Sequence, residues 1–256
     1  MTITEKYIKV KKQTIFTRQY TPDENNNNPT IVLLHEALGC TTHWRNFPEK
    51  LAAKTNSVVL LYDRLGHGLS EPMTEPRGVD YLHKEAWEIL PSVLKSFKIK
   101  KPILLGHSDG GTIALLYAAR FETHAIITEA AHVFVEPITV EGINKALPQK
   151  AVLIEKLGKY HGIKTEALFN AWSDTWLDIA FQTWNIETFL QKIHCPALII
   201  QGDMDEYGTF EQVKHIEDGI GENAEACIIE NCGHTPHKEA EDIVLEKIAV
   251  FINEVV

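Results

Sequence analysis

The sequence has no long apolar segment and few features that would suit a polyanionic partner. No stretch approaches the ~20 apolar residues of a membrane span, and residues 1–6, MTITEK, lack the apolar core of a signal peptide. The 25 basic and 35 acidic residues give a net charge of −10, which disfavours nucleic acid and anionic membrane surfaces. We therefore expect a cytoplasmic protein whose partner is a small-molecule substrate, with no nucleic acid and no membrane; no oligomeric state is indicated.

The sequence also lacks the spacings that hold metal ions or form disulfide frameworks. Its four cysteines show no C-x-x-C pair, so we expect buried thiols. In the segment 35–39, HEALG, a glycine stands where a zinc-binding His-Glu-x-x-His helix has its second histidine. The segment 203–208, DMDEYG, shares an Asp-x-Asp pair with calcium loops but lacks their third oxygen ligand and distal glutamate. We expect no metal and no cofactor.

The sequence does contain an apolar strand that runs directly into Gly-His-Ser-Asp-Gly and then into a helix. Residues 102–111 are PILLGHSDGG, and residues 112–120, TIALLYAAR, carry apolar side chains at helical spacing. In a sharp strand-turn-helix the central residue is strained and its side chain is exposed, and glycines on either side avoid collisions across the bend. Ser108, between Gly106 and Gly110, is therefore predicted to be a nucleophile.

A serine hydroxyl needs a general base and a carboxylate that orients the base, and later strands supply candidates for both. Asp205 follows an apolar run in a Gly-x-x-Asp register, and His234 lies on a glycine-preceded loop after another strand pattern. We predict Asp205 as the acid and His234 as the base. Asp203, two residues before Asp205, and Glu129, at the end of an earlier strand, are rival acids.

Strand and helix patterns alternate along most of the chain. A polar loop at 25–28 follows a predicted hairpin, and the span 133–193 has no strand pattern but contains helical segments at 143–158 and 166–177. The alternation predicts a largely parallel sheet with helices on both faces and a ligand site outside the carboxyl ends of its strands. The predicted strands are 7–10, 14–20, 31–35, 58–63, 103–107, 125–129, 198–201 and 227–230.

In these motifs, and in the order Ser108, Asp205, His234, the chain resembles the α/β-hydrolase fold family of serine hydrolases and esterases along nearly its whole length. The segments 33–39, LLHEALG, and 62–70, YDRLGHGLS, add to the resemblance. It implies an α/β fold with a mostly parallel twisted sheet of about eight strands and helices on both faces. Residues 1–132 and 194–256 would form this core, and residues 133–193 would form an inserted helical cap that covers the active site and selects substrates.

The resemblance also implies an oxyanion hole made by the backbone N–H groups of Ala37 and Asp109, the latter at a helix N-terminus that favours negative charge. Glu36 stands where the family often has glycine. Its carboxylate either points into a hydrogen-bond network or faces the pocket, where it would hinder oxyanion formation. The Asp109 side chain either serves the helix N-terminus or binds a substrate amine. The candidate substrate-binding residues are Glu36, Asp109, Phe134, Trp172 and Trp176.

These features predict a serine hydrolase that cleaves a carboxylic ester, or a related acyl bond, of a small molecule through an acyl-enzyme on Ser108. Hydrolysis of a C–C bond and cofactor-free perhydrolysis use the same catalytic parts and stay open as alternatives. A ligand-binding member of the fold without turnover is the alternative from a different class, because a fold alone does not prove chemistry.

Overall fold

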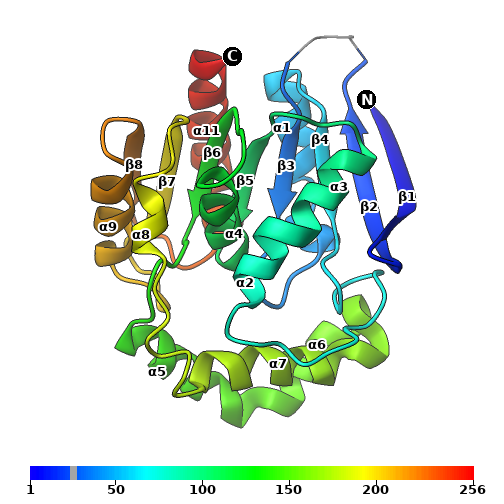
Figure 1. The fold of residues 1–256 in the computed structure, drawn as a ribbon, viewed down its shortest axis with the longest axis vertical. Helices are drawn as coiled ribbons and strands as arrows, with labels where there is room; N and C mark the ends of the chain where they lie inside the picture. The colour runs from blue at the N-terminus through cyan, green and yellow to red at the C-terminus, as the bar shows by residue number, and fades with distance from the viewer. Residues whose placement is uncertain (24–27) are drawn as a thin grey trace.

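The computed structural model describes residues 1–23 and 28–256, and a single eight-stranded sheet forms its centre (Figure 1). The strand order across the sheet is β1-β2-β4-β3-β5-β6-β7-β8. Of the polar loop predicted at 25–28, residues 25–27 lie outside the described residues. The strands are β1 (Thr2–Val10), β2 (Gln13–Thr21), β3 (Ile31–Leu34), β4 (Val59–Tyr62), β5 (Ile103–His107), β6 (Ala125–Glu129), β7 (Ala197–Gly202) and β8 (Ala224–Ile229).

The sheet is antiparallel at one side and parallel over the rest, as the alternation of strand and helix predicts. β1 pairs with β2 and β2 with β4 in antiparallel register, whereas every further neighbouring pair is parallel. β1 begins at Thr2 rather than near Tyr7. The sequence pattern does not predict this start, because the outer residues of the strand are exposed on both faces and show no apolar alternation. Parallel strands end at one edge, so the loops after β3, β5, β6, β7 and β8 meet there.

Helices cover both faces of the sheet, and alternate strand residues supply two apolar cores. On β3, Val32 and Leu34 belong to one core and Ile31 and Leu33 to the other, as the two-residue period of a strand requires. The helices on the first face are α2 (Tyr81–Lys84), α3 (Leu90–Ser96), α4 (Asp109–Ala118), α8 (Glu187–Leu190) and α9 (Phe210–Ile220). Those on the second are α1 (Phe47–Thr55) and α11 (Glu241–Val255), with the short α10 (Pro236–Glu239) before α11.

Three helices between β6 and β7 lie across one end of the sheet, at the bottom of Figure 1. They are α5 (Pro137–Ala146), α6 (Lys150–His161) and α7 (Thr165–Leu177), and we call them the cap helices. The segment predicted as helical at 143–158 is helical, but it is divided between α5, a short 3₁₀ turn at Leu147–Gln149 and α6. Pro148 lies in the short turn between α5 and α6, where its ring and missing N–H interrupt the helical hydrogen bonds.

Two cap side chains tie these helices to loops at the carboxyl edge of the sheet. The Nδ1 atom of His161 accepts a hydrogen bond from the Gly68 N–H (2.9 Å), and its Nε2 donates to the Leu38 carbonyl (2.9 Å). The Lys164 ammonium donates to the carbonyls of His67 (3.1 Å) and Gly68 (2.6 Å). The cap helices are therefore fixed over the loops that follow β3 and β4.

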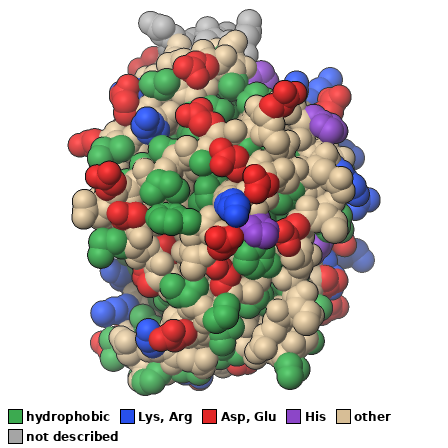
Figure 2. All heavy atoms as spheres, turned by 90° about the vertical axis from the view of Figure 1, so that its left-hand side faces the viewer, with side chains coloured by type: hydrophobic (Ala, Val, Ile, Leu, Met, Phe, Trp, Pro, Cys, Tyr) green, Lys and Arg blue, Asp and Glu red, His purple; other side chains and the backbone are tan. Residues whose placement is uncertain are grey.

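The outer face at the β8 edge of the sheet is acidic. Figure 2 shows acidic side chains scattered over this face with few lysines or arginines among them, in keeping with the net charge of −10. In the described part of the chain, no helix is long and apolar enough to cross a membrane. Exposed acidic residues of α9, β8 and their connection are Glu211, Asp218, Glu222 and Glu225.

Candidate active site

Ser108 lies at the sharp turn between β5 and α4, in a backbone conformation that few side chains adopt. Its φ is 54° and its ψ is −116°, so the residue is strained as the sequence pattern predicts. A Cβ on Gly106 would lie 2.0 Å from the Gly110 carbonyl oxygen, and a Cβ on Gly110 would lie 2.0 Å from that of Leu34. The turn therefore requires glycine at both positions.

The structure brings Ser108, His234 and Asp205 together at the carboxyl edge of the sheet. The Nε2 atom of His234 lies 3.1 Å from Ser108 Oγ, and its Nδ1 lies 2.8 and 2.9 Å from the two carboxylate oxygens of Asp205. The Asp205 carboxylate also accepts hydrogen bonds from the Gln201 side chain (2.8 Å) and the Tyr207 N–H (2.8 Å). These bonds fix the carboxylate, which in turn orients the imidazole.

The electrostatics of Asp205 suit this orienting position. Burial opposes ionisation, but the hydrogen bond and the charge of His234 outweigh it and lower the pKa of the Asp205 carboxyl below its ordinary value. A carboxylate with both oxygens bonded to N–H groups stays ionised at neutral pH. In the neutral ring this carboxylate favours the tautomer with the proton on Nδ1, which leaves Nε2 to accept from the Ser108 hydroxyl.

Neither rival acid contacts His234. Asp203 accepts a hydrogen bond from the Cys232 N–H (3.2 Å). Glu129 accepts one from Nδ1 of a different histidine, His237, at 2.6 Å, and this second acid and imidazole pair is buried. The geometry leaves Asp205 as the carboxylate that orients His234.

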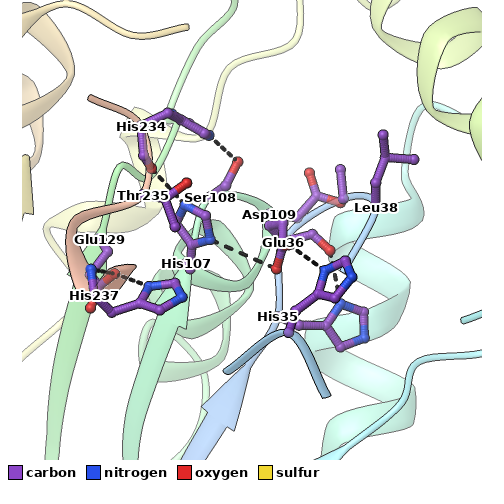
Figure 3. Close-up of polar contacts among 12 residues, drawn as sticks. His35, Glu36, Leu38, His107, Ser108, Asp109, Glu129, His234, Thr235 and His237 are labelled. Carbon is purple, nitrogen blue, oxygen red and sulfur yellow. Dashed lines mark hydrogen bonds and ion pairs between the residues drawn. The ribbon is translucent and has the colours of Figure 1, made fainter. Parts of the chain in front are cut away.

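His107, which immediately precedes Ser108, supports the His234 loop. Its Nε2 donates to the His234 backbone carbonyl at 2.7 Å, and its Nδ1 lies 3.8 Å from Glu36 Oε2 (Figure 3). Burial alone would lower the pKa of His107, but the carboxylate of Glu36 outweighs burial and raises it. The raised pKa favours the protonated ring, which can hold His234 and offset the charge of Glu36 at once.

Glu36 borders the cavity beside Ser108, and its carboxylate is held by side chains. Oε1 accepts a hydrogen bond from His43 Nδ1 at 3.0 Å, and Oε2 faces His107. Although burial opposes ionisation, these two imidazoles hold the pKa of Glu36 well below its ordinary value. The negative charge that could hinder an oxyanion is thus paired, although the side chain does line the cavity.

The two residues whose backbone amides are predicted to form an oxyanion hole border the same cavity as Ser108. Asp109 is the first residue of α4, so its N–H has no partner inside the helix. The Ala37 N–H donates to no acceptor among the residues the structure describes. Both amides are therefore available to a ligand, and the dipole of α4 favours negative charge beside one of them.

The Asp109 side chain is buried and fully engaged. Its Oδ2 accepts from the Arg64 guanidinium (3.1 Å) and its Oδ1 from the Tyr81 hydroxyl (2.9 Å). Trp176 of α7 donates its indole N–H to the same hydroxyl (3.0 Å), which connects the cap helices to this ion pair. Because Arg64 already neutralises the carboxylate, the geometry does not favour Asp109 as a binding group for a substrate amine.

A cavity of about 200 Å³ opens beside Ser108 and His234 beneath the cap helices. Of the predicted substrate-binding aromatics, Trp172 and Trp176 line it, whereas Phe134 instead packs against His215 with ring centres 5.1 Å apart. His132 also lines the cavity, and sequence reasoning missed it. Its position three residues beyond the predicted strand 125–129 was the available signal. The apolar lining consists of Ala37, Leu38, Ile143, Ala146, Leu153, Trp172 and Trp176.

The four cysteines are free thiols, three of them buried and Cys195 half-buried. Across residues 1–23 and 28–256, no group of three or more His, Cys, Asp or Glu side chains is placed to hold a metal ion. The polar groups beside Ser108 instead bond to one another in acid and imidazole pairs.

Comparison with known proteins assigns the chain to a family. Residues 31–246 match the family model described as the alpha/beta hydrolase family. The chain belongs to the alpha/beta hydrolase family. The predicted family and fold class are thereby confirmed, and the protein is a hydrolase of that family.

Individual relatives are distant. Human serine hydrolase BPHL is 27% identical over 58% of this chain, and the chain spans about half of that relative, 53% of its length. A proline iminopeptidase from Saccharolobus solfataricus is 25% identical over 99% of this chain and 93% of its own length. The enol-lactonase structure from Burkholderia xenovorans LB400 has a TM-score of 0.76 at 19% identity, covering 97% of this chain and 100% of that chain, which shows the shared fold alone.

Proposed function

We propose that this alpha/beta hydrolase is a serine hydrolase that cleaves a carboxylic ester, or a related acyl bond, of a small molecule through an acyl-enzyme on Ser108. One observation carries the proposal. His234 bonds the Ser108 hydroxyl with one ring nitrogen and the Asp205 carboxylate with the other, and the serine opens onto an apolar cavity. This is the geometry that activates a serine hydroxyl as a nucleophile.

In the first half-reaction, Ser108 Oγ attacks the ester carbonyl carbon while His234 Nε2 takes the hydroxyl proton. The carbonyl oxygen becomes an oxyanion that accepts hydrogen bonds from the Ala37 and Asp109 amides, each worth about 3 kcal/mol of barrier. The tetrahedral intermediate collapses as His234 gives its proton to the departing alcohol oxygen. In the second half-reaction a water molecule, with His234 again as base, attacks the acyl-enzyme and releases the acid and free Ser108.

The cavity favours an uncharged acyl group of modest size. Its wall is mostly apolar, and the two carboxylates that border it, Glu36 and Asp109, are already paired with His43, His107 and Arg64. A substrate ammonium would have to compete with these partners for a carboxylate. We therefore propose a neutral ester rather than an N-terminal peptide, even though several relatives carry the name proline iminopeptidase.

The test is labelling with a fluorophosphonate probe together with hydrolysis of short-chain and medium-chain p-nitrophenyl esters. Wild type should be labelled and should turn over the esters, and Ser108→Ala should lose both. Ser96→Ala, which alters an exposed helical serine of α3 bonded only to the Ser92 carbonyl, is the matched control and should retain both. A folded wild type that the probe does not label would overturn the proposal in favour of a ligand-binding protein.

A further inference from the structure

Among the side chains that line the cavity beside Ser108, one buried imidazole has bonding that the proposed reaction does not explain. Glu36 and Asp109 are paired, and the Thr139 hydroxyl donates to the Tyr207 carbonyl at 2.6 Å. His234 serves Ser108. The remaining imidazole, His132, borders the cavity and is 3% exposed.

The backbone holds His132 firmly in place. It lies just beyond the end of β6, where its N–H donates to the Thr112 hydroxyl (3.2 Å) and its carbonyl accepts from that hydroxyl (2.6 Å). The ring lies between two aromatic neighbours, with its centre 5.2 Å from the Trp176 ring and 6.1 Å from the His234 ring. A ring held this tightly is a preorganised contact for a ligand.

Neither nitrogen of this ring bonds to any residue that the structure describes. Nδ1 is completely enclosed and unpartnered, and a Cβ added to Gly208 would lie 3.5 Å from it. This leaves Nε2 as the nitrogen for a ligand in the cavity. Burial, with the nearby His234, lowers the pKa of His132 to about 4, so the ring is neutral at neutral pH. Nε2 is thus a polar atom of a 3% exposed side chain with no partner among the described residues, and a ligand oxygen in the cavity would supply one.

We propose that His132 is a specificity-determining residue that hydrogen-bonds a second oxygen of the substrate. The substrate class is then esters or lactones whose acyl group carries a hydroxyl or oxo group close to the ester carbonyl. The proximity follows from the 6.1 Å between the His132 and His234 ring centres and the 3.1 Å from His234 to Ser108 Oγ. This inference rests on the proposed esterase function and names its substrate.

The first experiment compares kcat/KM for ethyl butanoate with that for ethyl 3-hydroxybutanoate and ethyl 3-oxobutanoate. Wild type should prefer the oxygen-bearing esters by about tenfold, which is the effect of one buried hydrogen bond. His132→Phe keeps an aromatic ring but removes both nitrogens, so it should lose this preference and change butanoate hydrolysis much less. His132→Gln retains a donor and should keep part of the preference. His215→Phe, the same substitution at a half-buried histidine outside the cavity, should match wild type.

Binding to Ser108→Ala separates this inference from the proposed function. Quenching of tryptophan fluorescence, with Trp176 beside His132, should show tighter binding of ethyl 3-oxobutanoate than of ethyl butanoate, and the added His132→Phe change should remove the difference. Equal binding of the two esters would overturn the role of His132 whether or not the enzyme turns esters over. An equal loss of activity on all three esters in His132→Phe would overturn it as well. If Ser108→Ala binds the two esters with different affinities but wild type shows no Ser108-dependent hydrolysis, only the esterase function would be overturned.

Discussion

Two pairs of a carboxylate and an imidazole lie at the same edge of the sheet, and one of them faces a serine. In Asp205 and His234, one histidine nitrogen meets the carboxylate and the other meets Ser108 Oγ. In Glu129 and His237, one nitrogen meets the carboxylate at 2.6 Å, but the ring stacks on Trp44 with ring centres 4.3 Å apart. The side chain of His234 is 15% exposed and that of His237 only 2%.

The comparison shows that an oriented histidine is not by itself a catalytic one. Both carboxyl groups have lowered pKa values, because the partner histidine outweighs the opposing effect of burial in each case. What differs is the group at the second ring nitrogen and its access to the cavity. We therefore propose a catalytic role for Asp205 and His234, and a role in the stability of the loop that carries His234 for Glu129 and His237.

Removing each carboxylate in turn tests the difference between the two pairs most directly, and Asp205→Asn should have the largest effect. The amide can no longer hold the histidine in the correct tautomer, so kcat should fall about ten-thousandfold. The initial rate of hydrolysis of a p-nitrophenyl ester measures the fall in kcat. Glu129→Gln serves as the matched control and should change kcat by less than about threefold. The reverse pattern would show that Glu129 is the catalytic acid.

Glu129→Gln should instead lower the stability of the fold. Glu129 Oε2 accepts from both the ring and the backbone N–H of His237, and Oε1 is buried without a partner among the described residues. The substitution weakens a charge-assisted hydrogen bond and places amide hydrogens in a site with no acceptor, so the free energy of unfolding should fall by about 2 kcal/mol. Urea unfolding at neutral pH measures the change. Unaltered stability would mean that the second pair contributes nothing.

His107 links the two acid and imidazole pairs, and its hydrogen bond to the His234 carbonyl can be tested with a matched pair of variants. His107→Leu removes the donor, so the His234 loop loses one support and kcat should fall about tenfold. His107→Gln can still donate to that carbonyl and should retain most of the activity. Initial rates measured from about pH 6 to about pH 9 would separate a positioning effect from a change in protonation. Equal losses in both variants would argue against the hydrogen bond.

The strength of local patterns explains what the sequence could predict. The turn at Ser108 depends on neighbours a few residues away, Gly106 and Gly110, so the pattern is visible in the chain itself. Asp205 and His234 follow strands whose carboxyl ends must meet at one edge of a parallel sheet. Pro148, in the turn that divides the predicted helical segment 143–158, is another such local signal.

The pairing of side chains across long sequence distances could not be predicted in the same way. Glu36 meets His107 across 71 positions, and whether it faced the pocket or a bonding network could not be decided from its spacing. The same is true of Asp109, whose partners Arg64 and Tyr81 come from other segments. Such contacts depend on how the loops fold over one another, which no periodicity records.

The smallest predicted effect concerns a third pair, Glu36 and His107, whose contribution to stability should depend on pH. The pKa of Glu36 is lowered, so its contribution is present above the ordinary value of 4.5 and is lost as the pH falls toward the folded-state value. The pKa of His107 is raised, so its contribution is full below the ordinary value of 6.5 and is lost as the pH rises through the folded-state value.

The two contributions overlap between pH 4.5 and 6.5, and there the difference in unfolding free energy between wild type and Glu36→Gln should be largest. We expect about 1 kcal/mol in that window, because the ion pair is long and Glu36 keeps some contact with solvent. Chemical denaturation at a series of pH values measures the difference, with Glu225→Gln on the exposed face of β8 as the control. A difference that stays constant across the whole pH range would mean that Glu36 acts through packing and not through its charge, and His107 would then need another source for its raised pKa.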